Sequence, residues 1–285
     1  MRLASRGTTA QAKTMDSTLH SPGKALSHVA DEAVVRRDRI IISACIALVT
    51  ILAWAYLFHL DHQMSADLRD AKMMAAMGMS MDGQWTGTDL LFTFAMWSIM
   101  MVGMMAPSAL PLLLVFAAAR AGRGERGLSP STLAFGLGYI AVWTAFSAGA
   151  TLAQYGLHRA ALLSSAMASS SSALSGTVLL AAGAYQLTRW KARCLIHCRS
   201  PLGFLMTNWR EGSFGALRMG FRHGIYCLGC CCALMCLLFV VGVMSLVWVA
   251  VLTCFVLIEK VGPAGAVAAR VAGAAMIILG IVVIA

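Results

Sequence analysis

Two stretches in the second half of the chain combine cysteine with histidine. Thiolate sulfur and imidazole nitrogen are protein ligands that zinc and monovalent copper favour. The cysteines and histidines of the two stretches therefore predict a site for a soft metal ion, with copper(I) preferred and zinc as the other candidate. Seven side chains are candidate metal ligands: Cys194, His197, Cys198, His223, Cys227, Cys230 and Cys231.

The spacing of these residues places several ligands on the same side of a helix. Cys194 and Cys198 are one helical turn apart, so a helix there would present both sulfurs together. If the second stretch is helical, steps of about 100° per residue put its four ligands within one arc and turn Cys232 and Cys236 away. We therefore expect the two stretches to form one thiolate pocket. Three isolated cysteines are expected to pack as small apolar residues: Cys45, Cys236 and Cys254.

Charged residues lie close in sequence to these thiols. A positive charge lowers the pKa of a thiol, and the thiolate is both the better ligand and the better nucleophile. We therefore expect Arg193, Arg199 and Arg222 to favour metal binding and thiol redox chemistry alike. Glu259 and Lys260, which follow the longest uncharged run, are expected to form an interfacial ion pair.

Methionine is a second source of sulfur, with 19 residues. Met96, Met100 and Met104 repeat every four residues in one apolar run, which would align them on a helix face. Thioethers bind monovalent copper, but methionine also fills gaps between helices, so a copper route and simple packing both remain open. Five more methionines lie between the first two apolar runs: Met73, Met74, Met77, Met79 and Met81.

The composition is that of an integral membrane protein. Hydrophobic residues make up 59% of the chain, charged residues only 12%, and the mean hydropathy is +0.77. We predict an all-α, polytopic transmembrane helix bundle, because each span needs about 20 apolar residues in helical form. Six or seven spans are expected, seven if a turn near residues 242–245 divides the fifth run. The apolar runs are 40–60, 90–119, 132–155, 174–188, 227–258 and 264–285.

The distribution of lysine and arginine predicts the orientation. The stretch 189–223 carries seven lysine and arginine residues and one acidic residue. The loop 61–89 carries two basic and five acidic residues. By the positive-inside rule, the N-terminus and the Cys/His loop 189–226 face the cytoplasm, and the Met-rich loop faces outward. We predict a disordered cytoplasmic tail over 1–39 and a multi-pass bundle over 40–285 in the cell inner membrane. The net charge of +10 mostly reflects this topology, so no nucleic-acid partner is expected.

A series of short motifs carries a resemblance to a known family: 95–108, 185–188, 191, 194–202, 216–220, 223–224, 227–231, 233–235, 242–244 and 259–260. In this order they resemble an uncharacterised bacterial family of predicted metal-binding integral membrane proteins, domain of unknown function 2182. The resemblance covers roughly residues 40–262 and implies metal binding through the Cys/His motifs. Arg189 and Trp190 stand where the family has proline and leucine, and Cys232 stands in place of a tryptophan.

The motifs of common enzymes are not found. The sequence has no phosphate-binding glycine loop, serine-nucleophile motif or His-Glu-x2-His zinc helix, which argues against hydrolysis and nucleotide-driven pumping. We predict a protein that binds a soft metal ion at a cytoplasm-facing site and handles or transports it, rather than an enzyme. Its expected partners are the lipid bilayer and the metal ion, and no protein partner is identified. Two alternatives remain: a membrane thiol-disulfide oxidoreductase using Cys194/Cys198 and Cys227/Cys230, and a non-catalytic subunit of a membrane complex.

Overall fold

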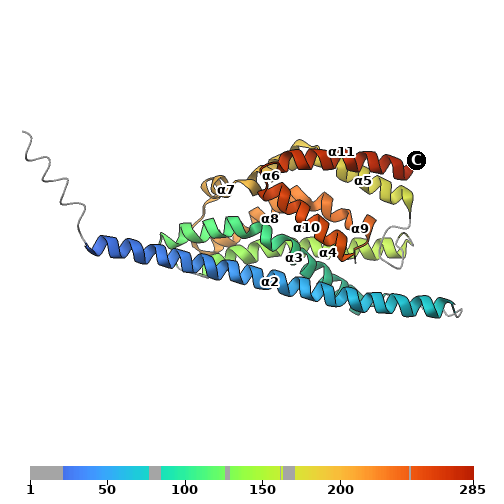
Figure 1. Cartoon of the computed structure of the whole chain (residues 1–285), viewed down its shortest axis with the longest axis horizontal. Helices are drawn as coiled ribbons and strands as arrows, with labels where there is room; N and C mark the ends of the chain where they lie inside the picture. The colour runs from blue at the N-terminus through green and yellow to red at the C-terminus, as the bar shows by residue number, and fades with distance from the viewer. Residues whose placement is uncertain (1–21, 77–84, 126–128, 161, 163–170, 244) are drawn as a thin grey trace, which may run out of the picture.

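The computed structural model describes residues 22–76, 85–125, 129–160, 162, 171–243 and 245–285. Within these ranges the chain forms helices joined by short connections, and no strand is present, so the predicted all-α fold is confirmed. The helices, shown in Figure 1, are α2 (Pro22–Ala76), α3 (Gly87–Ala121), α4 (Pro130–Arg159), α5 (Ser172–Gln186), α6 (Arg189–Arg199), α7 (Pro201–Asn208), α8 (Gly212–Cys236), α9 (Leu238–Val241), α10 (Leu246–Val261) and α11 (Gly265–Ile284).

Among the described residues, five segments are long and apolar enough to cross a membrane: Arg36–Met64 of α2, α3, α4, Gly212–Val241 across α8 and α9, and α11. Helices α5 and α10 are also apolar, but their 15 and 16 residues extend over only about 22–24 Å of a hydrocarbon core of roughly 30 Å. These segments overlap the six predicted apolar runs, and two of them share the run 227–258, where the first segment already begins at Gly212. The turn expected near 242–245 is confirmed, since α9 ends just before Gly242, which has a φ of 99°.

Helix α2 includes part of the segment predicted as a disordered tail. It begins at Pro22 and continues through residue 39, while residues 1–21 lie outside the described part of the chain. Alanine and arginine, both good helix formers, are frequent in this part of α2. The boundary predicted at residue 39 is therefore not a break in secondary structure.

The two predicted loops are partly helical. The first part of the loop 61–89 belongs to α2, and its last residues begin α3, where Thr86 and Asp89 form a capping box. The Cys/His loop 189–226 folds into α6, α7 and the first turns of α8. Both Cys/His stretches are therefore helical, which is the condition under which their spacing groups the ligands on one face. Three of the loop methionines lie outside the described residues: Met77, Met79 and Met81.

Helices α4 and α8 approach each other closely through glycine. A Cβ atom added at Gly138 of α4 would collide with the Leu217 carbonyl of α8, and one added at Gly220 of α8 would collide with the Phe135 carbonyl of α4. Small residues allow membrane helices to pack at such short range. This contact fixes the first half of α8, and with it the second Cys/His stretch, against α4.

The remaining helices surround this contact. Figure 1 shows the long α2 on one side of the bundle, where it packs on α3, and the pair α5 and α11 on the opposite side. Between them, α6 packs on α8, and α10 contacts α3, α6 and α8. This arrangement places the C-terminal part of α10 beside both Cys/His helices.

Candidate metal centre

Helix α6 brings the first Cys/His stretch against the second. The Sγ atoms of Cys198 on α6 and Cys230 on α8 are 3.9 Å apart. Cys194 lies against the same part of α8, since a Cβ atom added at Gly229 would be 2.8 Å from its sulfur. Thiols that are distant in sequence thus meet at one place, which we call the α6–α8 junction.

The four candidate ligands of α8 share one buried face, as the spacing predicted. All four are at most 3% exposed, whereas Cys236 on the same helix is exposed and Cys232 is half-buried. The thiols of Cys230 and Cys231 both donate to the backbone carbonyl of Cys227, over 3.1 and 2.8 Å. Two thiols of the junction are therefore held by the preceding turn of their own helix.

Cys227 lies at the centre of a buried polar cluster. Its Sγ is 3.0 Å from the Tyr139 hydroxyl and 2.9 Å from Lys260 Nζ. Lys260 Nζ is also 3.0 Å from Ser108 Oγ and 3.9 Å from Met105 Sδ. A lysine of α10 therefore contacts the thiol cluster directly. The cysteine spacing does not predict this contact, although a lysine beside an apolar run is itself a signal of function in a membrane protein.

Glu259 does not pair with its neighbour Lys260, so the expected ion pair is wrong. Its carboxylate accepts hydrogen bonds from Lys191 Nζ over 2.7 and 2.8 Å and from Gln186 Nε2 over 3.3 Å. Lys191 and Glu259 are each 1% exposed, so this pair lies inside the bundle. It connects α6 to α10 and leaves the ammonium group of Lys260 to the thiols.

The arginines near the thiols bind other groups or face outward. Arg199 donates to the backbone carbonyls of Glu259 and Gly262 over 2.7 and 2.8 Å, at the end of α10. Helix C-termini carry partial negative charge, so a guanidinium group is stabilising there. Arg193 and Arg222 are exposed. The Arg199 guanidinium group thus helps to position α10 on α6 rather than act on the sulfurs.

The thiols of α6 accordingly have high pKa values. Burial, followed by the nearby thiols of Cys230 and Cys232, raises the pKa of Cys194. The Cys198 thiol donates a hydrogen bond to Cys227, and this bond raises the pKa of Cys198 well above its ordinary value. The prediction that neighbouring arginines lower the thiol pKa is therefore wrong for α6.

The two candidate histidines have different surroundings. The ring of His197 stacks on Tyr226 with centroids 4.2 Å apart, and its Nδ1 is 2.9 Å from the Arg193 carbonyl. His223 is buried with its ring stacked on Tyr139, and its Nδ1 has no hydrogen-bond partner among the described residues. A buried polar atom without a partner is costly and calls for a ligand. The structure therefore favours His223 over His197 as an additional metal ligand.

The methionines of α3 belong to the same core cluster as the α8 thiols. Met96, Met100 and Met104 are buried in it among apolar side chains, as the packing interpretation expects. Met105 differs from them, because its Sδ lies 3.9 Å from Cys231 Sγ. One thioether of α3 is therefore in contact with the thiol cluster.

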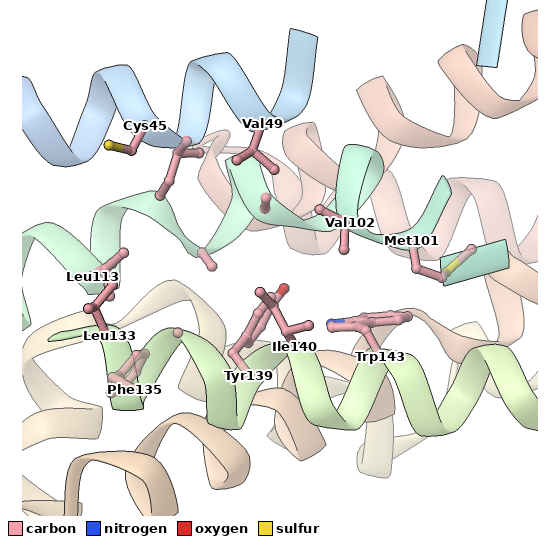
Figure 2. A pocket seen from close by; sticks show the side chains of 14 residues that line it. Cys45, Val49, Met101, Val102, Leu113, Leu133, Phe135, Tyr139, Ile140 and Trp143 are labelled. Atoms are coloured by element: carbon pink, nitrogen blue, oxygen red, sulfur yellow. The ribbon is translucent and has the colours of Figure 1, made fainter. Parts of the chain in front are cut away.

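A separate apolar cavity of about 240 Å³ lies between α2, α3 and α4. Figure 2 shows that Tyr139 and Trp143 form one of its walls and that Cys45 lies on the opposite helix, α2. None of the clustered thiols lines this cavity. Tyr139 separates the two regions, since its hydroxyl contacts Cys227. The setting of Cys45 agrees with the expected packing role.

The sulfur geometry fits a soft ion, although the coordination sphere is incomplete. No group of three or more Cys, His, Asp or Glu side chains is close enough to hold a metal ion in the part of the chain that is described. Two thiolates that share one tetrahedral ion at ~2.3 Å lie roughly 3.8 Å apart. The distance of 3.9 Å between Cys198 and Cys230 matches this value.

A comparison with known protein families identifies the family of this chain. A family model described as "PpoB2: Copper chaperone" matches residues 94–283. The chain belongs to this family. The matched range includes both Cys/His stretches, the α3 methionines and Lys260. The expected membership in a metal-related family is thereby confirmed, and copper, not zinc, is the metal that its description names. No curated protein and no solved structure matches the chain.

Proposed function

We propose that this protein binds Cu(I) as its cargo at the α6–α8 junction and transfers it to an acceptor. The observation that carries the proposal is the convergence of Cys198 from α6 with Cys227 and Cys230 from α8. Membership in a family described as copper chaperones supports the same ion. Cys194, Cys231 and His223 surround these three thiols and complete the set of available ligands.

The donor atoms favour Cu(I) over harder ions. Thiolate and thioether sulfur select monovalent copper, whereas carboxylate and carbonyl oxygen suit calcium and magnesium. The nearest buried carboxylate, Glu259, is bound by Lys191 and Gln186 and is therefore not a free ligand. The donors available to an incoming ion at the junction are thus sulfur atoms, because the carboxylate oxygens of Glu259 are already hydrogen-bonded. His197 is retained as a candidate only for an accessory role beside Tyr226.

The burial of the thiols indicates an order of transfer. Cys194 and Cys198 are half-buried, while Cys227, Cys230 and Cys231 are fully buried. An ion that arrives from outside the bundle would first meet the α6 thiols and then exchange onto the α8 thiols. Each step would replace one sulfur ligand by another, so the ion would never lose all of its ligands. The Met105 thioether, beside Cys231, would be the next donor.

The orientation of the chain is part of the proposal. Lysine and arginine are concentrated in the segment that forms α6, α7 and the start of α8, which favours a cytoplasmic position for the junction. The acceptor would then receive copper on the cytoplasmic side of the inner membrane, or the donor would supply it there. We further propose that the chain is a member of domain of unknown function 2182, whose motif pattern it resembles.

A thiol-disulfide oxidoreductase is the second candidate function. The contact between the Cys198 and Cys230 sulfurs favours it, because two thiols at van der Waals distance need only a small rotation to form a disulfide. This pair joins α6 to α8, unlike the intrahelical pairs Cys194/Cys198 and Cys227/Cys230 expected from the sequence. Oxidation would then connect the two helices covalently.

Copper binding by the reduced protein tests the proposed function. We expect the purified, fully reduced protein to retain about one Cu(I) per chain after removal of free metal, as measured by mass spectrometry of its metal content. Bound copper should also protect the clustered cysteines from alkylation, whereas Cys236, which is exposed, should remain reactive. Copper at background level with all thiols reduced would contradict the proposal. A disulfide between Cys198 and Cys230 that cycles at cytoplasmic potentials, without copper, would favour the oxidoreductase.

A further inference from the structure

Lys260 places a positive charge inside the proposed copper site. It is 6% exposed, and its Nζ is 2.9 Å from Cys227 Sγ and 3.0 Å from Ser108 Oγ. The adjacent carboxylate of Glu259 is directed to Lys191 instead. A buried cation is expensive in a membrane protein, and one that contacts a thiol, a thioether and a hydroxyl rather than a carboxylate requires a functional explanation.

We propose that Lys260 is a specificity-determining residue that favours monovalent over divalent soft cations at the α6–α8 junction. This inference rests on the proposed function, since it assumes that the junction binds a metal ion. Cu(I) and Zn(II) both have a filled d shell and both accept thiolate ligands. The main physical difference between them at a fixed set of sulfurs is their charge.

The repulsion between an ion and the lysine ammonium is proportional to the charge of the ion. A divalent ion bound to Cys227 is therefore repelled about twice as strongly as a monovalent ion in the same place. This repulsion is large, because the Cys227 sulfur is 2.9 Å from Lys260 Nζ and an ion bound to it would lie within a few ångströms of the ammonium group. Little water separates the two charges, since both Cys227 and Lys260 are buried.

The ratio of the two affinities isolates this effect. When the same thiolates bind both ions in the wild type and in the variant, the contributions of these thiolates and of their protons to the ratio are the same in both proteins, so the change in the ratio reports the charge of the lysine. One unit of charge at ~4 Å with an effective dielectric constant near 20 changes an equilibrium constant by up to roughly a thousandfold. Lys260 can also turn toward Ser108, which reduces the repulsion. We therefore expect a change in the ratio of at least about tenfold.

The substitution Lys260→Leu removes the charge and introduces an apolar side chain without a sulfur donor. The affinities for Cu(I) and Zn(II) would be measured by competition with chelators, under anaerobic conditions, on purified full-length protein. We expect Lys260→Leu to lower the preference for Cu(I) over Zn(II) at least about tenfold, mainly through tighter Zn(II) binding. Lys260→Arg, which retains the charge, should keep the wild-type preference.

Arg270→Met is the matched control, because it removes one positive charge from an exposed position on α11. It should leave the affinity ratio unchanged. An unchanged ratio in Lys260→Leu, with both ions still bound, would overturn the inference and leave the proposed function intact. Loss of both ions in Lys260→Leu but not in Lys260→Arg would also overturn it, because the lysine would then support binding rather than discriminate. A wild-type protein that binds neither ion would instead remove the proposed function and this inference together.

Discussion

Replacing Cys227 by serine is expected to lower the affinity for Cu(I) at least about a hundredfold, because it removes the central soft ligand. Cys227 is the thiol that the structure connects to both helices: it receives a hydrogen bond from Cys198 of α6, and its carbonyl binds the thiols of Cys230 and Cys231. A serine hydroxyl is a hard donor and does not replace a thiolate for monovalent copper. Competition with a Cu(I) chelator on the purified protein measures the change.

The same helix offers a matched control for this substitution. Cys236 belongs to α8 but is exposed and lies off the ligand face. Cys236→Ser should therefore bind Cu(I) as the wild type does. If both variants bound copper with wild-type affinity, the site would lie elsewhere in the chain. An equal loss in both variants would indicate damage to α8 rather than removal of a ligand, which the far-ultraviolet circular dichroism of the two proteins would reveal.

The substitution Lys191→Met is expected to destabilise the bundle by roughly 3–5 kcal/mol, since it leaves the buried carboxylate of Glu259 without its cation. Both side chains are 1% exposed, and two contacts of 2.7 and 2.8 Å join them. Gln186 is a weaker substitute, at 3.3 Å from the carboxylate. Thermal unfolding in detergent should show a midpoint lower by on the order of 10 °C.

A double substitution separates the loss of the ion pair from a packing defect. Lys191→Met/Glu259→Met removes both charges and leaves apolar side chains of similar size, so it should recover most of the lost stability. A double variant no more stable than Lys191→Met would show that the pair acts through shape rather than charge. Neither residue contacts a candidate thiol, so copper binding by the double variant should change less than its stability.

The periodicity of the cysteines was sufficient to predict that the Cys/His side chains of α8 share one buried face. In a helix, residues three and four apart lie on one side, and burial of that side follows when the helix packs against others. His223, Cys227 and Cys231 are spaced by four residues, and all are buried on α8, while Cys236 falls outside this face. The division of the longest apolar run near Gly242 could be predicted in the same way, from its length and from a residue that tolerates positive φ.

The partners of the charged residues could not be predicted from local sequence. Glu259 and Lys260 are adjacent, but neighbouring residues on a helix point about 100° apart, so each meets a different helix. Glu259 meets α6 through Lys191, and Lys260 meets α3 and α8 through Ser108 and Cys227. These contacts depend on how α10 is placed among its neighbours, which no pattern within α10 specifies. The role expected for the arginines failed for the same reason.

The methionine pattern shows the limit of composition as evidence. A repeat of four residues predicts a common helix face equally well for packing and for metal binding, because both require inward-pointing side chains. The structure places Met96 and Met100 among apolar neighbours and Met105 beside Cys231. A second sulfur atom nearby is what distinguishes a thioether that is able to bind a metal ion from one that only fills space in the core.

X-ray absorption at the copper edge of the Cu(I)-loaded protein tests most directly whether thiols of α6 and α8 share one ion. We expect a first shell dominated by sulfur, and the loss of one sulfur in Cys198→Ser as well as in Cys227→Ser, since these residues approach the junction from different helices. A shell of nitrogen and oxygen, or a sulfur shell that Cys198→Ser leaves unchanged, would contradict it.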